Sequence, residues 1–147
     1  MNNSNFIHSE ITNKIINCFY KVYNKLGYGF YEKIYERALL IELNRAGINF
    51  TSQKTFKVYY DEFEIGKFTP DVLVENLVVI ENKAAVTISA AHEDQLKNAL
   101  RATDFEVGVL LNFGVAPQFK RKVFANEFKN HYKNKEKRII SDPKIKS

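Results

Sequence analysis

The chain has 147 residues, which is the length of one domain and too short for two. Apolar residues make up 45% of it, enough to bury a core, and its single cysteine, Cys18, excludes an intramolecular disulfide. Its apolar runs are shorter than a bilayer requires, and no basic, then apolar, leader opens the sequence. We therefore expect one cytoplasmic domain that does not enter a membrane.

The net charge of +5 is distributed unevenly along the chain. Residues 118–147 hold 10 Lys and Arg against 3 Asp and Glu, whereas residues 1–117 hold 12 against 14. A basic segment of this kind can follow a phosphate backbone. It can also be a solvated end that aids solubility. We expect a domain over residues 1–124 and a basic C-terminal tail over residues 125–147.

Helical spacing of apolar residues predicts two helices at the start of the chain. The first runs from Ser9, which can cap it, to Leu26, and the glycines that follow end it. The second runs from about residue 30 to residue 46 and stops at Gly47. The residues expected to point inward from it are Ile34, Ala38, Leu39 and Leu43.

Strand patterns dominate the rest of the chain. The expected strands are Thr55–Tyr60, Phe63–Phe68, Val72–Val74, Leu77–Ala84, Glu106–Phe113 and, less regular, Phe119–Phe124. A turn at Glu75-Asn76 joins the third strand to the fourth, and Ser89 can cap a helix over residues 90–102. Residues 126–137 fit a helix or a frayed tail. The order predicts an α/β fold, with a mixed β-sheet flanked by helices.

Two short segments contain candidate catalytic residues: Pro70-Asp71 and, nine residues later, Glu81-Asn82-Lys83. Side chains at i and i+2 of a strand share a face, so Glu81 and Lys83 point the same way. The turn at residues 75–76 brings Asp71 alongside them. Two carboxylates and an ammonium group would then converge at the end of an otherwise apolar strand.

This set of side chains suits phosphodiester hydrolysis. Two carboxylates are hard oxygen ligands for Mg²⁺ or Mn²⁺, which activates water and polarises the phosphate. Lys83 can position the attacking water or offset the charge that builds on phosphorus. The same spacing also occurs in ordinary strands that end in a solvated Glu–Lys pair, so the motif needs further support.

The order of five short motifs resembles the GxxExxY family, a branch of the PD-(D/E)xK nuclease superfamily. The motifs span about three quarters of the chain: Gly29-Phe30-Tyr31-Glu32-Lys33-Ile34-Tyr35, Pro70-Asp71, Glu81-Asn82-Lys83-Ala84, His92-Glu93-Asp94-Gln95-Leu96 and Leu110-Leu111-Asn112-Phe113-Gly114. The resemblance implies a restriction-endonuclease-like fold and a metal-dependent nuclease. It also favours DNA over RNA as the substrate.

The resemblance adds two residues to the site. It implies that Glu32, on the second helix, joins the metal shell with Asp71 and Glu81, and that Gln95 contacts the substrate or a metal-bound water. Without the resemblance, both are ordinary exposed helical residues. His92, one turn before Gln95, is expected to be structural, or to support the site without contacting the substrate, rather than to be catalytic.

Two positions depart from the pattern of related nucleases. Ala99 occupies the position where a tyrosine often follows Gln95, and Asn82 replaces an apolar residue between Glu81 and Lys83. An Asn82 side chain that faces the core would need a hydrogen-bond partner. These departures leave open a module that keeps the fold and binds nucleic acid or protein without turnover, or a tail that binds another acidic partner.

The strand register and the resemblance together predict that Glu32, Asp71, Glu81 and Lys83 cluster. Three carboxylates brought together with one lysine should repel one another, so we expect at least one carboxylate pKa to rise in the metal-free protein.

Overall fold

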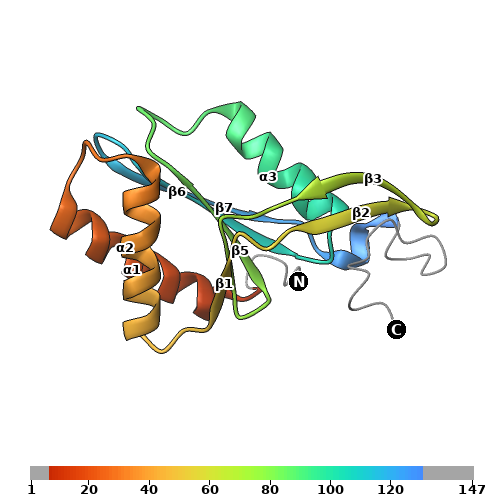
Figure 1. Cartoon of the computed structure of the whole chain (residues 1–147), viewed down its shortest axis with the longest axis horizontal. Helices are drawn as coiled ribbons and strands as arrows, with labels where there is room; N and C mark the ends of the chain where they lie inside the picture. The colour runs from red at the N-terminus through yellow and green to blue at the C-terminus, as the bar shows by residue number, and fades with distance from the viewer. Residues whose placement is uncertain (1–6, 131–147) are drawn as a thin grey trace.

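A computed structural model describes residues 7–130 (Figure 1). In chain order the elements are α1 (Ser9–Leu26), α2 (Glu32–Arg45), β1 (Phe50–Ser52), β2 (Phe56–Tyr60), β3 (Phe63–Phe68), β4 (Val72–Val74), β5 (Val78–Lys83), α3 (Ala90–Ala102), β6 (Val107–Phe113), β7 (Pro117–Val123) and the short 3-10 helix η2 (Asn126–Phe128).

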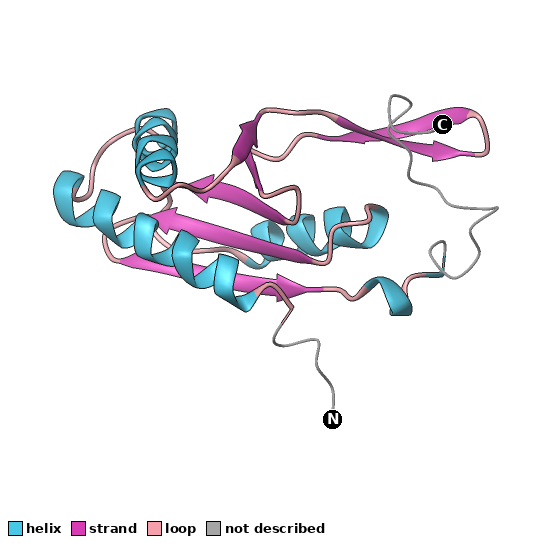
Figure 2. Ribbon diagram, turned by 90° about the horizontal axis from the view of Figure 1, so that it is seen from below, coloured by secondary structure: helices cyan, strands magenta, loops and turns pink. Residues whose placement is uncertain are grey.

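The described strands form a five-stranded sheet in the order β1-β4-β5-β6-β7 and a separate hairpin of β2 and β3. Only β5 and β6 pair in parallel, because α3 crosses between them, and the other neighbours are antiparallel. Helix α1 lies across one face of this sheet and α3 across the other (Figure 2). This is the mixed α/β sandwich expected from the sequence, with a restriction-endonuclease-like core.

Helices α1 and α2 cover one face of the sheet over the larger core cluster. Its buried residues include Phe19, Leu39, Val78, Ile80 and Phe113. Helix α3 covers the other face over a smaller cluster of Phe56, Leu73, Val79, Leu96, Leu100 and Leu110. Because successive side chains of β5 go to opposite clusters, both faces of this central strand are buried, as its continuous apolar run indicates.

Tyr35 explains most of the GxxExxY pattern in structural terms. Its ring is fully buried and stacks on Phe113, with ring centroids 4.4 Å apart. Its hydroxyl donates to the Gly27 carbonyl at 2.5 Å and accepts from the Phe30 amide at 3.2 Å, which holds the loop before α2. Gly29 lies in this loop at φ +116°, a conformation that favours glycine. Tyr35 is thus a packing residue.

The structure also departs from the expected elements. Strand β1 was not expected, and β7 begins at Pro117 rather than Phe119. Ser9 is the first residue of α1 rather than its cap, which is His8. Ile34 is 42% exposed, because the buried face of α2 runs through Tyr35, Leu39 and Leu43 instead. Of residues 126–137, expected to form a helix or a frayed tail, residues 126–128 form the 3-10 helix η2, and residues 131–137 lie outside the described range.

Candidate metal centre

Asp71 lies in the bend between β3 and β4, where hydrogen bonds from two other segments hold it. The backbone N–H of Gln53 donates to the Asp71 main-chain carbonyl at 3.1 Å, which continues the pairing of β1 with β4. On the other side, the Asn82 amide donates to Asp71 Oδ2 at 2.8 Å. Since that amide belongs to β5, the Asp71 carboxylate is fixed against the strand that carries Glu81 and Lys83.

The turn between β4 and β5 creates this juxtaposition. Glu75 and Asn76 both adopt positive φ, at 54° and 55°, and the Leu77 amide donates to the Val74 carbonyl at 2.9 Å. The resulting antiparallel register pairs Val72 with Ile80. The expected turn is confirmed, and it brings Asp71 to Glu81 as the spacing predicted.

Glu81 and Lys83 occupy the α3 side of β5. Val79, two residues before Glu81, belongs to the cluster under α3, so alternation places Glu81 and Lys83 on the same side. Both side chains are half-buried. Two carboxyl groups and one ammonium group therefore meet at the end of the central strand, although the sheet around them is apolar.

The electrostatics of this pair are strained in the metal-free protein. Burial raises the pKa of Glu81 to about 8, and the nearby Asp71 carboxylate adds to the rise. Lys83 acts in the opposite direction but does not compensate. Glu81 is thus the carboxyl group whose pKa lies above its ordinary range, with desolvation as the main cause and repulsion second.

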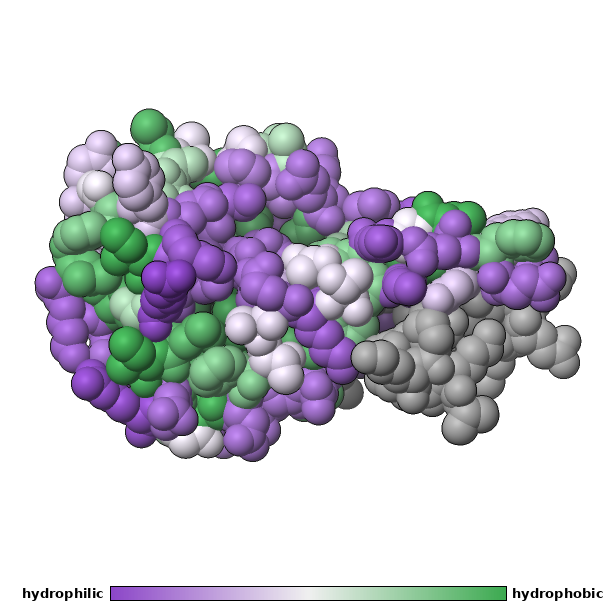
Figure 3. Space-filling model, in the orientation of Figure 1, coloured by the Kyte–Doolittle hydropathy of each residue, from purple (hydrophilic) through white to green (hydrophobic). Residues whose placement is uncertain are grey.

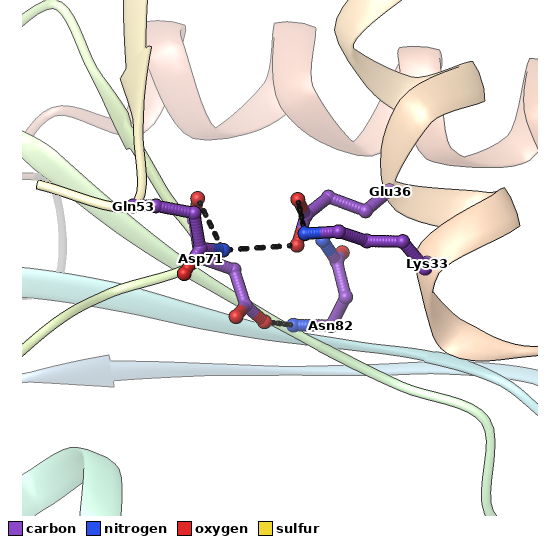
Figure 4. A network of polar contacts seen from close by, with 5 residues as sticks. All are labelled: Lys33, Glu36, Gln53, Asp71 and Asn82. Atoms are coloured by element: carbon purple, nitrogen blue, oxygen red, sulfur yellow. Dashed lines mark hydrogen bonds and ion pairs between the residues drawn. The ribbon is translucent and has the colours of Figure 1, made fainter.

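A polar network continues from Asp71 to α2 (Figure 4). Gln53 Nε2 donates to Glu36 Oε1 at 3.4 Å and lies 3.5 Å from the Asp71 carbonyl. Glu36 is 6% exposed, and its other oxygen accepts from Lys33 Nζ at 3.0 Å. Glu36 is thus the buried carboxylate that α2 directs toward the Asp71 bend. No sequence pattern marked it as a site residue, although it directly follows Tyr35.

Asn82 lies between the Asp71 carboxylate and the Glu36–Lys33 pair of α2. Its main chain holds Asp71, while its side chain points to the α2 side of the sheet, toward Glu36 and Lys33 (Figure 4). The side chain is 2% exposed, and neither Oδ1 nor Nδ2 has a hydrogen-bond partner. The Asn82 side chain therefore faces the core, where the sequence indicated that it would need a hydrogen-bond partner. Its side-chain amide has none.

The segment that follows Lys83 is clamped by β6. The buried Asn112 side chain accepts from the Ala85 amide at 2.9 Å and donates to the Ala85 carbonyl at 3.0 Å. A Cβ on Gly114 would collide with that same carbonyl oxygen, so only glycine fits there. Asn112 and Gly114 thus fix the direction in which the chain leaves Lys83, a role that no sequence pattern indicated.

The two remaining expected site residues lie on helices and are exposed. Glu32 is in the first turn of α2, where a carboxylate interacts favourably with the helix dipole. Gln95 is exposed on α3. His92 has the expected structural role, because Ser89 Oγ accepts from its amide and its ring Nδ1 accepts from the Ser89 amide.

The expected cluster of Glu32 with Asp71 and Glu81 is not formed. Within residues 7–130, no group of three or more His, Cys, Asp or Glu side chains lies close enough to share one metal ion. The reason is that α2 begins at Glu32, so its next turn, with Glu36, approaches the sheet instead. Asp71 and Glu81 alone still fit Mg²⁺, which is held by one or two carboxylates and otherwise by water and substrate phosphates.

None of the helices between residues 7 and 130 is both long enough and apolar enough to traverse a bilayer.

Comparison with known proteins shows the family of the chain. No curated protein and no solved structure matches the chain. The model of one family, described as the PD-(D/E)XK nuclease superfamily, matches residues 9–123, a range that includes every element from α1 to β7 and the Asp71, Glu81 and Lys83 constellation. The chain belongs to the PD-(D/E)XK nuclease superfamily.

Proposed function

We propose that this protein is a divalent-metal-dependent nuclease of the GxxExxY branch that hydrolyses phosphodiester bonds in DNA. The observation that supports this most is the Asp71–Glu81 pair. Two carboxylates are held together in a half-buried position where their repulsion adds to the rise in the pKa of Glu81. A divalent cation would remove that repulsion, so the arrangement is suited to binding one.

The chain's own residues divide the work as follows. Asp71 and Glu81 would hold Mg²⁺ or Mn²⁺, which supplies an activated water and polarises the phosphate when bound. Lys83, beside Glu81, would hold the attacking water or stabilise the charge on the phosphorane. The Asn82 amide would keep Asp71 in place, and Asn112 would orient the backbone after Lys83.

Glu32 and Gln95, both on helices, have less support from the geometry than Asp71, Glu81 and Lys83. Glu36 is better placed than Glu32 to assist from α2, because it is buried and linked to the Asp71 bend through Gln53. Glu32 as a metal ligand stays a prediction that this geometry does not favour. Gln95, exposed on α3, would contact the substrate from outside the carboxylate pair. A cytoplasmic location likewise stays a prediction.

The proposal is tested by cleavage of plasmid and single-stranded DNA with Mg²⁺ or Mn²⁺, with EDTA as the control. Glu81→Gln and Lys83→Met should each lower the cleavage rate by roughly 100-fold or more. Lys97→Met, at an exposed position of α3, is the matched control and should cleave normally. Cleavage that persists in EDTA, or in both site variants, would refute the proposed centre.

A binding module without turnover is the second candidate. It is favoured by Ala99, which is buried at the position where related nucleases often carry tyrosine. This candidate predicts DNA binding without cleavage at any metal concentration. In either case we propose that the basic tail contributes to binding, although residues 131–147 lie outside the described range.

Truncation after Asn130 tests the tail and leaves Lys129, which is buried, in place. Each phosphate that the shortened chain no longer neutralises should flatten the slope of log K against log salt by about 0.9 for duplex DNA. Binding measured by fluorescence anisotropy over a salt series gives this slope. An unchanged slope would assign the tail to solubility.

A further inference from the structure

The β2–β3 hairpin extends beyond the main sheet at one end of the molecule (Figure 2). Among the described residues its two strands pair only with each other. Isolated two-stranded hairpins are marginally stable in water, and their outer edges carry unpaired backbone groups. A hairpin that projects from the body therefore needs support from its side chains or from a partner.

The hairpin register sorts these side chains onto two different faces. A bulge adds Ile65 opposite Val58, and beyond it Tyr59 pairs with Glu64 and Tyr60 with Phe63. One face is charged, because Lys57 and Lys67 both approach Glu64, at 3.5 and 3.9 Å. The other face is an apolar stripe made of Phe56, Val58, Tyr60, Phe63, Ile65 and Phe68.

The apolar stripe begins in the core and continues out of it. At its base Phe56 is 7% exposed and packs edge-on against Phe105, with centroids 5.0 Å apart. Toward the turn, Tyr60, Ile65 and Phe63 are each more than half exposed. Figure 3 shows apolar side chains (green) among polar ones at this end of the molecule. Contiguous apolar surface of this kind marks an interaction site.

Charge along the hairpin indicates the partner. The turn is acidic, with Asp61 and Glu62 exposed, while Lys54 is exposed at the base, with its ammonium over the Phe56 ring where the stripe begins. An acidic turn beside the aromatic residues would repel a phosphate backbone. A second hairpin laid antiparallel on the first would instead place each acidic turn on the other's basic base and bring the two apolar stripes together.

We propose that the apolar stripe of the β2–β3 hairpin is a two-fold interface that binds the hairpin of a second copy of this chain. Each turn would contact the partner's base, and Phe63 of one copy would cover the base end of the other copy's stripe. The interface is small, so the dimer should dissociate on dilution. This proposal does not depend on nuclease activity, because it rests on the hairpin alone.

Sedimentation velocity of the full chain over a concentration series tests the proposal. Phe63→Asp should weaken dimerisation at least tenfold. Ile41→Asp is the matched control, because Ile41 is also an exposed apolar residue, 53% exposed, but lies on α2. Phe63 is exposed, so the melting temperature of the variant should stay close to that of wild type, which excludes unfolding as the cause.

Charge reversal separates this partner from other occupants of the stripe. Asp61→Lys with Glu62→Lys should give a monomer, and so should Lys54→Glu. Mixing these two variants should restore a dimer, because each turn then faces an opposite charge. A wild type that stays monomeric to about 1 mM, or a mixture that stays monomeric, would overturn the proposal. So would a monomer whose Phe63→Asp variant loses DNA binding, which would assign the stripe to the substrate.

Discussion

Lys129 and Glu81 are two ionisable groups of the described residues whose pKa is shifted mainly by burial, and they differ in the groups that surround them. Lys129 is 1% exposed, and its ammonium donates to the Thr103 carbonyl at 2.7 Å, the Phe105 carbonyl at 2.8 Å and Asn126 Oδ1 at 2.7 Å. Those three bonds use all three of its donors. Glu81, in contrast, lies beside a second carboxylate and opposite one lysine.

This difference separates a structural charge from a functional one. Lys129 anchors the segment after β7 to the end of α3, and its bonds leave nothing for a ligand. Ionising both Asp71 and Glu81 creates a repulsion that a cation would relieve, which is a reason to expect binding rather than packing. A shifted pKa occurs at both places, so the shift alone does not distinguish them, whereas the neighbours do: three neutral oxygens surround Lys129, and a second carboxylate lies beside Glu81.

The largest effect should come from Asp71→Asn, which keeps the shape of the side chain and removes its negative charge. We expect cleavage to fall about 100-fold or more, while the melting temperature in EDTA stays equal or rises. Mn²⁺ should raise the melting temperature of wild type and not of this variant.

Asp71→Ala provides the comparison, because it also removes the bond from the Asn82 amide and should be less stable in EDTA by about 1 kcal/mol. Thermal melting of the three proteins with EDTA and with Mn²⁺ distinguishes the cases. Equal stabilisation of all three by Mn²⁺ would show that Asp71 does not bind the metal.

Lys129→Met tests whether the buried Lys129 stabilises the fold. It leaves the Thr103 and Phe105 carbonyls without their donor in a buried position, and we expect a loss of about 3 kcal/mol in the free energy of unfolding. Urea denaturation measures this loss, with Lys97→Met, exposed on α3, as the control. Metal-induced stabilisation should be unchanged, and its loss would mean that the two places are coupled.

The two places should respond to pH in opposite directions. The folded-state pKa of Glu81 is raised from 4.5 to about 8, so the metal-free folded protein binds the extra proton and its stability should fall as pH rises through that range. The slope is at most about 1.4 kcal/mol per pH unit for one proton. Glu81→Gln should lack this slope, and a variant that keeps it would assign the slope to another group.

Burial lowers the pKa of Lys129 from 10.5 to about 8, against the opposing effect of Glu106 and Asp104. In this case the unfolded chain binds the extra proton, so the contribution of Lys129 to stability should rise between about pH 8 and 10.5. The stability difference between wild type and Lys129→Met should therefore widen across that range in urea denaturation. A difference that shrinks would show that the ammonium, with its three bonds, is favoured in the folded state.

The smallest effect is expected at Asn82. Its side-chain amide has no partner, so Asn82→Leu removes an unsatisfied polar group, while the main-chain bond to Asp71 remains. We expect the protein to be equally stable or more stable by about 1 kcal/mol in urea denaturation. A large loss of stability together with weaker Mn²⁺ binding would show that the amide has a polar role toward Glu36.

Local patterns in the sequence determined the order of the elements and the metal motif. The bounds of β3, β4 and α3 agree with those predicted, because apolar spacing and the Ser89 cap are properties of neighbouring residues. The Asp71 to Glu81 contact was also predictable, since one turn and the alternation of a strand suffice to build it.

Tertiary structure alone decided which side chains complete the site. The phase of α2 against the sheet buries Glu36 and exposes Glu32, and that phase depends on Tyr35 packing on Phe113, far away in the chain. The pKa of Glu81 and the burial of Lys129 are likewise set by segments remote in sequence. Desolvation and repulsion depend on distances between groups in the folded protein, and the spacing of residues along the chain does not give those distances.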